Sequence, residues 1–134
     1  MDYDRVQVSQ YLRKKLKEFP LYEESHCISV VVRDKVWIGY APTSRTIENF
    51  PKTRFDIQIE PDVCYVVSFN IEEDKWRQGH GSSLAGIIED FVSEEFDCKR
   101  IVTTPSGMSK EHHFWESNGF SYFDDGVEVE KILT

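Results

Sequence analysis

The alternation of hydrophobic and polar positions divides the chain into three expected helices and seven expected strands. Apolar residues recur at helical spacing over residues 4–19, and Pro20 then ends the helix. Alternation with a period of two, which is typical of strands with one buried face, recurs further along the chain. The pattern places two further helices at about 82–96 and 109–118, and strands at 27–33, 36–40, 55–59, 63–71, 99–104, 120–124 and 127–133.

Residues 63–71 are expected to form the central strand of a sheet. In regular alternation, the odd-numbered apolar positions share one face: Val63, Tyr65, Val67, Phe69 and Ile71. Cys64 and Val66 then point to the opposite face. Because both faces are largely apolar, this strand should be central and not at an edge of the sheet.

Turn residues support this division of the chain. Gly119 stands where a helix would end in the left-handed conformation, and Asp125-Gly126 is a strong signal for a two-residue hairpin turn. The order of elements predicts an α+β (mixed α/β) fold, in which helices flank a mostly antiparallel sheet with a strand–helix–strand unit at its middle. Without repeats or a long linker, we expect residues 1–134 to form a single domain.

Composition narrows the class of protein. The 134 residues include 40% hydrophobic residues, enough to build a core, and no run is long enough to span a membrane. A net charge of −8 argues against nucleic acid as the main partner. The three scattered cysteines, Cys27, Cys64 and Cys98, suggest buried, reduced thiols in a cytoplasmic protein. These features are compatible with both a monomer and a homodimer.

Residues 69–84 carry the most informative chemistry: a strand end, a polar loop, Gly79 and Gly81, and then a helix start. Glycine lets the backbone approach a ligand closely, and helix-start amides favour an anion such as a pyrophosphate. Arg77 can add a positive charge. A P-loop would need a lysine after Gly81, and a dinucleotide fingerprint would need a glycine where Leu84 stands. A tight turn without a ligand is the structural alternative.

Two motifs resemble the GNAT superfamily of acyl-CoA-dependent N-acetyltransferases. Residues 77–84 are similar to the pyrophosphate loop of that family, and residues 114–120 resemble its aromatic-rich helix end with a Gly-Phe pair. The resemblance implies a splayed mixed sheet, acetyl-CoA as the acyl donor, and direct transfer of acetyl to a primary amine within a ternary complex. The residues implied to bind acetyl-CoA are Phe69 and Ile71 through their backbone, Arg77, Gln78, Gly79, His80, Gly81 and Ser82 around the pyrophosphate, and Trp115.

The chain departs from the family pattern at three positions. Trp76 occupies the usual Gln/Arg position of the loop, and Met108 stands where the family often has an asparagine. Trp115 replaces a tyrosine that protonates the leaving thiolate in many members, and indole cannot serve as that acid. These departures keep two alternatives open: a non-catalytic CoA-binding or regulatory member of the fold, and a small interaction module.

Acetyl transfer to an amine also requires a group that takes the proton of the amine. The candidate bases are Glu60, Glu72 and Glu73, although each is also readily explained as a surface carboxylate. Ser68 could relay a proton through water, but it points to the opposite face from Phe69. His112 lies one helical turn before Trp115 and could supply the missing acid.

The remaining predictions concern metal ions and the acceptor. Adjacent residues diverge by about 100° around a helix, so His112 and His113 cannot hold one metal ion, and we expect no metal site. A cationic amine acceptor is favoured by an expected acidic rim around the cleft, formed by Glu60, Asp62, Glu72, Glu73 and Asp74.

Overall fold

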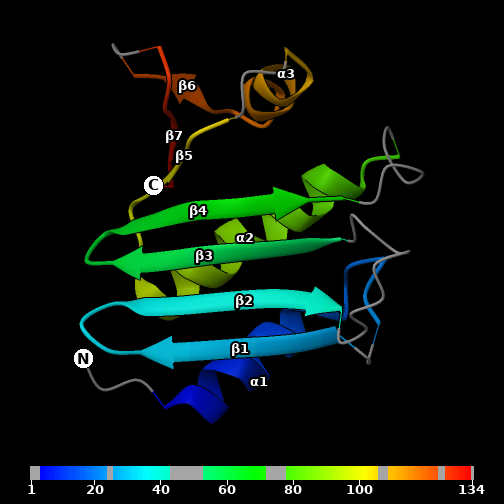
Figure 1. Cartoon of the computed structure of the whole chain (residues 1–134), viewed down its shortest axis with the longest axis vertical. Coiled ribbons are helices and arrows are strands. Elements are labelled where there is room, and N and C mark those ends of the chain that lie inside the picture. The colour runs from blue at the N-terminus through cyan, green and yellow to red at the C-terminus, as the bar shows by residue number, and fades with distance from the viewer. Residues whose placement is uncertain are drawn as a thin grey trace.

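The computed structural model describes residues 4–23, 26–42, 53–71, 78–105, 109–123 and 126–133, and it confirms the expected order of helices and strands (Figure 1). The elements are α1 (Arg5–Leu16), β1 (His26–Val32), β2 (Val36–Pro42), β3 (Arg54–Glu60), β4 (Val63–Asn70), α2 (His80–Phe96), β5 (Arg100–Thr103), α3 (Ser109–Ser117), β6 (Ser121–Tyr122) and β7 (Val129–Ile132). The first described element is helix α1, and the last described strands, β6 and β7, pair antiparallel.

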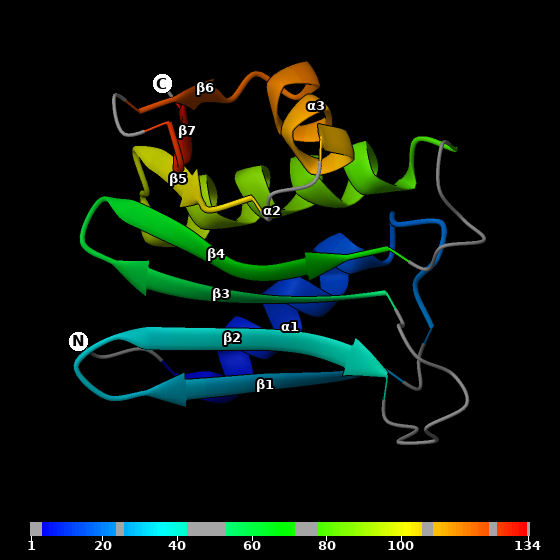
Figure 2. The same cartoon turned by 45° about the horizontal axis from the view of Figure 1, so that its top comes forward.

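The strands form one seven-stranded sheet in the order β1-β2-β3-β4-β5-β7-β6. Every pairing is antiparallel except that of β4 with β5, which α2 connects as the expected strand–helix–strand unit. Strand β4 is the central strand, as predicted. Helices α1 and α2 both lie behind β1–β4 in Figure 1, and Figure 2 shows the same arrangement with the top of the molecule turned toward the viewer. The fold class is therefore confirmed as a mixed α+β sandwich with a mostly antiparallel sheet.

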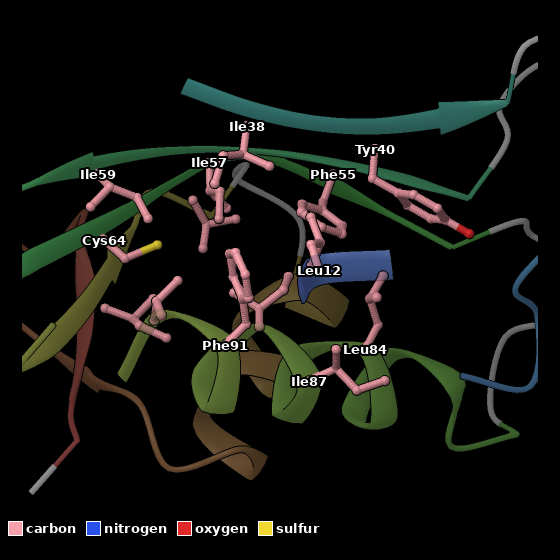
Figure 3. Packing of buried hydrophobic residues seen from close by; sticks show 14 of the residues in the cluster. Leu12, Ile38, Tyr40, Phe55, Ile57, Ile59, Cys64, Leu84, Ile87 and Phe91 are labelled. Carbon is pink, nitrogen blue, oxygen red and sulfur yellow. The ribbon is translucent and has the colours of Figure 1, made fainter. Parts of the chain in front are cut away.

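The core lies between the sheet and helices α1 and α2. Phe55, Ile57 and Ile59 alternate along β3 and are all buried, as their spacing predicts. Figure 3 shows these side chains pointing toward Leu12 of α1 and Phe91 of α2. Burial of each large apolar side chain contributes about 1.5–3 kcal/mol, so this layer is the main source of stability.

The opposite face of β1–β4 carries no helix in the part of the chain that the structure describes. Trp37 of β2 is 42% exposed on it and pairs with Val31 of β1, which is also exposed. We call this surface the open face.

A β-bulge changes the predicted alternation in β4. Ile57 pairs with Val66, but the preceding residue of β3, Asp56, pairs with Ser68, so Val67 is an extra residue without an opposite partner. The bulge turns Phe69 to the core face, where it lies opposite Phe55, whereas Val67 is 57% exposed. The predicted grouping of Phe69 with Val63, Tyr65 and Val67 is therefore wrong, because periodicity alone does not reveal an inserted residue.

The structure confirms the predicted turn at Gly119, and it describes one of the two residues of the predicted hairpin turn at 125–126. Gly119 has a φ of +91°, and Phe120 N–H donates to the Trp115 carbonyl, which is the expected left-handed end of α3. In the last hairpin, Gly126 has a φ of +70° and donates to the Phe123 carbonyl. Asp125 lies outside the described residues.

The three cysteines are free thiols, and they differ in burial. Cys64 and Cys98 are buried, as expected, and burial raises the pKa of the Cys98 thiol to about 11 and that of Cys64 above its ordinary value. Cys27 is exposed on strand β1, which corrects its predicted burial. Cys27 is on the same face of β1 as the exposed Val31, which is the open face.

Candidate active site

The sheet splits between β4 and β5. The parallel pairing runs from Val63 opposite Arg100 to Val66 opposite Thr103, where β5 ends, while β4 continues to Asn70. At the split, the buried Thr103 hydroxyl donates a hydrogen bond of 3.1 Å to the Val66 carbonyl. We call this point, defined by Val66 and Thr103, the fork. Beyond it, the β5-facing edge of β4 has no described strand beside it, so an extended group with its own amides can add there as a strand.

The N-terminus of α2 lies at the same end of the sheet as the end of β4 (Figures 1 and 2). Gly79 is the N-cap residue, with a φ of +80° and no side-chain capping bond. The first helical hydrogen bond of α2 runs from Ser83 N–H to the Gly79 carbonyl, so the preceding amides of His80, Gly81 and Ser82 have no acceptor within the helix. These amides, at the positive end of a 17-residue helix, favour an anionic group.

The His80 side chain at this helix start contacts other parts of the protein and is not available to bind a phosphate. The His80 ring packs edge-on against Phe19 at 6.4 Å between centroids, and His80 Nε2 lies 3.3 Å from Gln78 Oε1. The imidazole is therefore engaged with the segment after α1, which leaves the backbone of His80 as its contribution to an anion site. Arg77 lies outside the described residues.

Gly81 lies against α3 as well as at the helix start. A Cβ atom on Gly81 would come 2.8 Å from Cε1 and 3.2 Å from Cζ of Phe114, and 3.7 Å from Ile71. Sequence reasoning explained this glycine by the approach of a phosphate. The structure adds a second reason, because the Phe114 ring occupies the space that a side chain would need.

Aromatic side chains close the helix side of the fork. Phe69 contacts Phe114 and Trp115 with ring centroids 5.6 and 5.3 Å apart, and Trp115 contacts Phe120 at 4.9 Å. Trp115 is 5% exposed, so the residue that replaces the family tyrosine packs within this aromatic cluster. The cavity here is about 10 Å³, the space of one water molecule, and is lined by Val66, Phe69, Ala85, Ile88, Glu89, Ile101, Trp115 and Phe120.

The site residues therefore fit an acyl-CoA in one specific way. The uncapped amides of α2 suit a pyrophosphate, and the open edge of β4 suits an amide-containing arm that runs from Ile71 toward the fork. Because the aromatic cluster fills the helix side, the space left for such an arm is beside β4, in the plane of the sheet.

The described candidate bases and acids lie away from this edge. Glu60 is paired with Val63 at the start of β4 and contacts Lys35 Nζ at 3.5 Å, which places it about 20 Å along the strand from Phe69. His112 stacks on Tyr122 of β6 at 5.3 Å, and residues two apart on a helix point about 200° apart, so it faces away from Phe114. Glu72 and Glu73 lie outside the described residues.

The two described residues of the expected acidic rim, Glu60 and Asp62, also lie far from the N-terminus of α2. Asp62 lies beside Glu60 in the β3–β4 turn, at the opposite end of β4 from the α2 N-terminus. Asp74 lies outside the described residues, as do the two glutamates before it. Within the described ranges, no three His, Cys, Asp or Glu side chains come together as metal ligands.

The structure brings together a polar pair that the sequence reasoning did not identify. Ser68 Oγ donates a hydrogen bond of 2.6 Å to Asp56 Oδ2 across β3 and β4, on the open face and beside the bulge at Val67. The only sequence signal was that both residues occupy polar positions of apolar strands. Their pairing depends on the strand register, which the bulge sets.

The split sheet, its open strand edge and the uncapped helix start define an acyl-CoA N-acyltransferase fold. The profile of the acetyltransferase (GNAT) family matches residues 2–120, so the chain belongs to that family. No curated protein sequence matches it. None of the described helices is long and apolar enough to cross a membrane.

Solved structures agree with this fold. The chain aligns with PaiA N-acetyltransferase from Thermoplasma acidophilum in complex with coenzyme A at a TM-score of 0.55 and 13% identity, covering 74% of this chain and 61% of PaiA. A GNAT family acetyltransferase from Elizabethkingia anophelis with acetyl-CoA bound gives 0.54 and 9%, covering 83% and 100%. GCN5 from Tetrahymena gives 0.55 and 8%, covering 96% and 88%. This chain thus spans about three fifths of the length of PaiA.

Proposed function

We propose that this protein transfers an acetyl group from acetyl-CoA to a primary amine, directly within a ternary complex. The observation that carries the proposal is that the uncapped N-terminus of α2 lies at the same end of the sheet as the part of β4 that continues past its pairing with β5. One surface suits an anion and the other suits an extended amide chain. An interaction module would need neither.

The binding roles follow from these surfaces. The amides from Gln78 to Ser82 and the charge of Arg77 would hold the pyrophosphate, and the backbone of Phe69 and Ile71 would pair with the pantetheine arm. Trp115 would act indirectly, by packing on Phe69 and keeping water out of the helix side of the fork. Acetyl-CoA supplies an activated thioester, and the protein contributes position and polarity around it.

The chemistry of the step sets three requirements. An alkylamine is protonated at neutral pH and must lose a proton before it can attack. The negative charge that develops on the carbonyl oxygen needs a donor, and a backbone N–H of β4 near the bulge can supply it. The thiolate can leave without a strong acid, because its pKa is not far above neutrality.

The amine acceptor would be cationic when it arrives. The net charge of −8 would attract a cation in a salt-dependent way and disfavour nucleic acid or acidic acceptors. The free cysteines support a reducing, cytoplasmic compartment. The acceptor class therefore includes polyamines, aminoglycoside-like molecules and lysine-bearing peptides.

A second candidate is a CoA-binding protein that does not catalyse transfer, favoured by the buried Trp115 in place of a catalytic tyrosine. Calorimetry with acetyl-CoA, followed by a thiol-release assay with a panel of amines, separates the two. Binding with amine-dependent thiol release supports the transferase. Binding without release from any amine supports the second candidate, and absence of binding contradicts both.

A further inference from the structure

The pair formed by Asp56 and Ser68 is built into the sheet beside the fork. Ser68 lies two residues beyond Val66, about 7 Å along β4, and its hydroxyl is half-buried on the open face. Its hydrogen bond to Asp56 Oδ2 is 2.6 Å long, which is typical of a hydroxyl that donates to a carboxylate. Arg54 Nη2 also lies 3.3 Å from Oδ2.

Gly39 of β2 determines where the other carboxylate oxygen lies. Gly39 pairs with Asp56, and a Cβ on Gly39 would come 2.8 Å from Asp56 Oδ1. The carboxylate therefore leans over the glycine, and a side chain there would displace Oδ1. The two carboxylate oxygens have different surroundings. Oδ2 accepts hydrogen bonds from Ser68 and Arg54, and Oδ1 lies over Gly39.

Of the two faces of the sheet beside the fork, the described elements fill one and leave the other uncovered. From the helix side, the aromatic cluster around Phe69 and Trp115 fills the space. From the open face, no described helix covers β4, and Val67 at the bulge is exposed. An amine that reaches the fork across the open face therefore comes close to the Ser68 hydroxyl.

We infer that the acceptor amine enters across the open face, and that Ser68 and Asp56 relay its proton away from the fork. This inference rests on the proposed function. Ser68 Oγ accepts a proton from the ammonium while its own proton moves to Asp56 Oδ2, and the exposed carboxylate then returns the proton to solvent. The neutral amine forms the new N–C bond as the C–S bond breaks, and the departing thiolate takes the second N–H proton. Ser68 is the residue that contacts the substrate, and Asp56 is a positioning residue that acts through it.

The test compares two amines of similar size at neutral pH and saturating acetyl-CoA: propylamine, which is protonated, and 2,2,2-trifluoroethylamine, which is already neutral. In Asp56→Asn and Ser68→Ala, kcat/KM for propylamine should fall about 100-fold, in the range of a lost general base. The value for trifluoroethylamine should change less than about 3-fold, because that amine has no proton to lose before attack. Ser68→Thr keeps the hydroxyl and should retain most of the wild-type rate.

Glu60→Gln is the matched control, because Glu60 is a carboxylate on the same strand and face as Asp56 but is paired at the far end of β4. It should leave both rates unchanged. Calorimetry should show that every variant binds acetyl-CoA as the wild type does. Equal losses with both amines, or no loss with either, would overturn the relay while the proposed function stands. Wild-type protein that acetylates neither amine, and no amine of the wider panel, would overturn the proposed function and the relay together.

Discussion

Gly81 at the start of α2 lies directly against Phe114 of α3, so close that a Cβ atom on the glycine would come 2.8 Å from the ring. The contact joins the two sequence motifs of the chain, the glycine loop and the aromatic helix end. It also makes the position of α3 depend on the absence of a side chain at residue 81. The uncapped N-terminus of α2 and the aromatic cluster beside the fork are therefore one packing unit.

Gly81→Ala should move the Phe114 ring and destabilise the protein by about 1–3 kcal/mol, the ordinary cost of overpacking. It should also weaken acetyl-CoA binding, because the first turn of α2 shifts with the ring. Urea denaturation and calorimetry measure the two effects. In a double mutant with Phe114→Leu, much of the lost stability should return. Gly86→Ala is the control within α2, since nothing lies within 4 Å of that Cβ position; equal losses at both glycines would contradict the packing role of Gly81.

Glycine should be needed at position 79 because of the backbone conformation there, and not because a side chain would clash with a neighbour. Its φ is +80°, and nothing lies within 4 Å of where a Cβ would be. Gly79→Ala should cost about 1–2 kcal/mol of unfolding free energy, because L residues with a side chain disfavour this region. Gly79→Asn should cost less, since asparagine tolerates it better. If thermal denaturation ranks alanine as the milder change, the left-handed N-cap is wrong.

Trp115→Phe should keep much of the turnover at saturating acetyl-CoA, because indole cannot act as the acid that protonates the thiolate. Its main cost should be stability, about 1–3 kcal/mol, since the smaller ring leaves a cavity beside Phe69 and Phe120. His112→Ala should also keep its turnover, because that ring stacks on Tyr122. Steady-state kinetics check both, and a large fall in kcat for His112→Ala would make His112 the acid.

Thiol labelling should separate the three cysteines. At pH 8 in native protein, only the exposed Cys27 should react quickly with a disulfide reagent, while Cys64 and Cys98 should react after unfolding. Burial raises the pKa of Cys98 from 9.0 to about 11, so the unfolded state loses this proton first. The unfolding free energy should therefore fall as the pH rises from 9 toward 11, and Cys98→Ala should reduce that slope. A second fast thiol in the native protein would contradict the buried placement.

Local patterns were enough to predict the elements, because their causes lie within a few residues. The alternation of Phe55, Ile57 and Ile59 marks one buried face of β3, and Gly119 supplies the left-handed residue that ends α3. The loop glycines indicated an anion site for the same reason, since a helix start and its amides are local features. The resemblance of two motifs then pointed to the family that the profile confirms.

The sequence by itself thus determined which segments are helices and strands, their order, and the presence of a helix start suited to an anion. Only the tertiary structure decided what lies next to what. The bulge at Val67 sets the register that joins Ser68 to Asp56, and strand pairing carries Glu60 to the far end of β4. Gly81 owes its second role to Phe114, 33 residues away. Such relationships come from contacts between distant segments, and neither propensity nor periodicity contains them, because both describe only the neighbours of a residue along the chain.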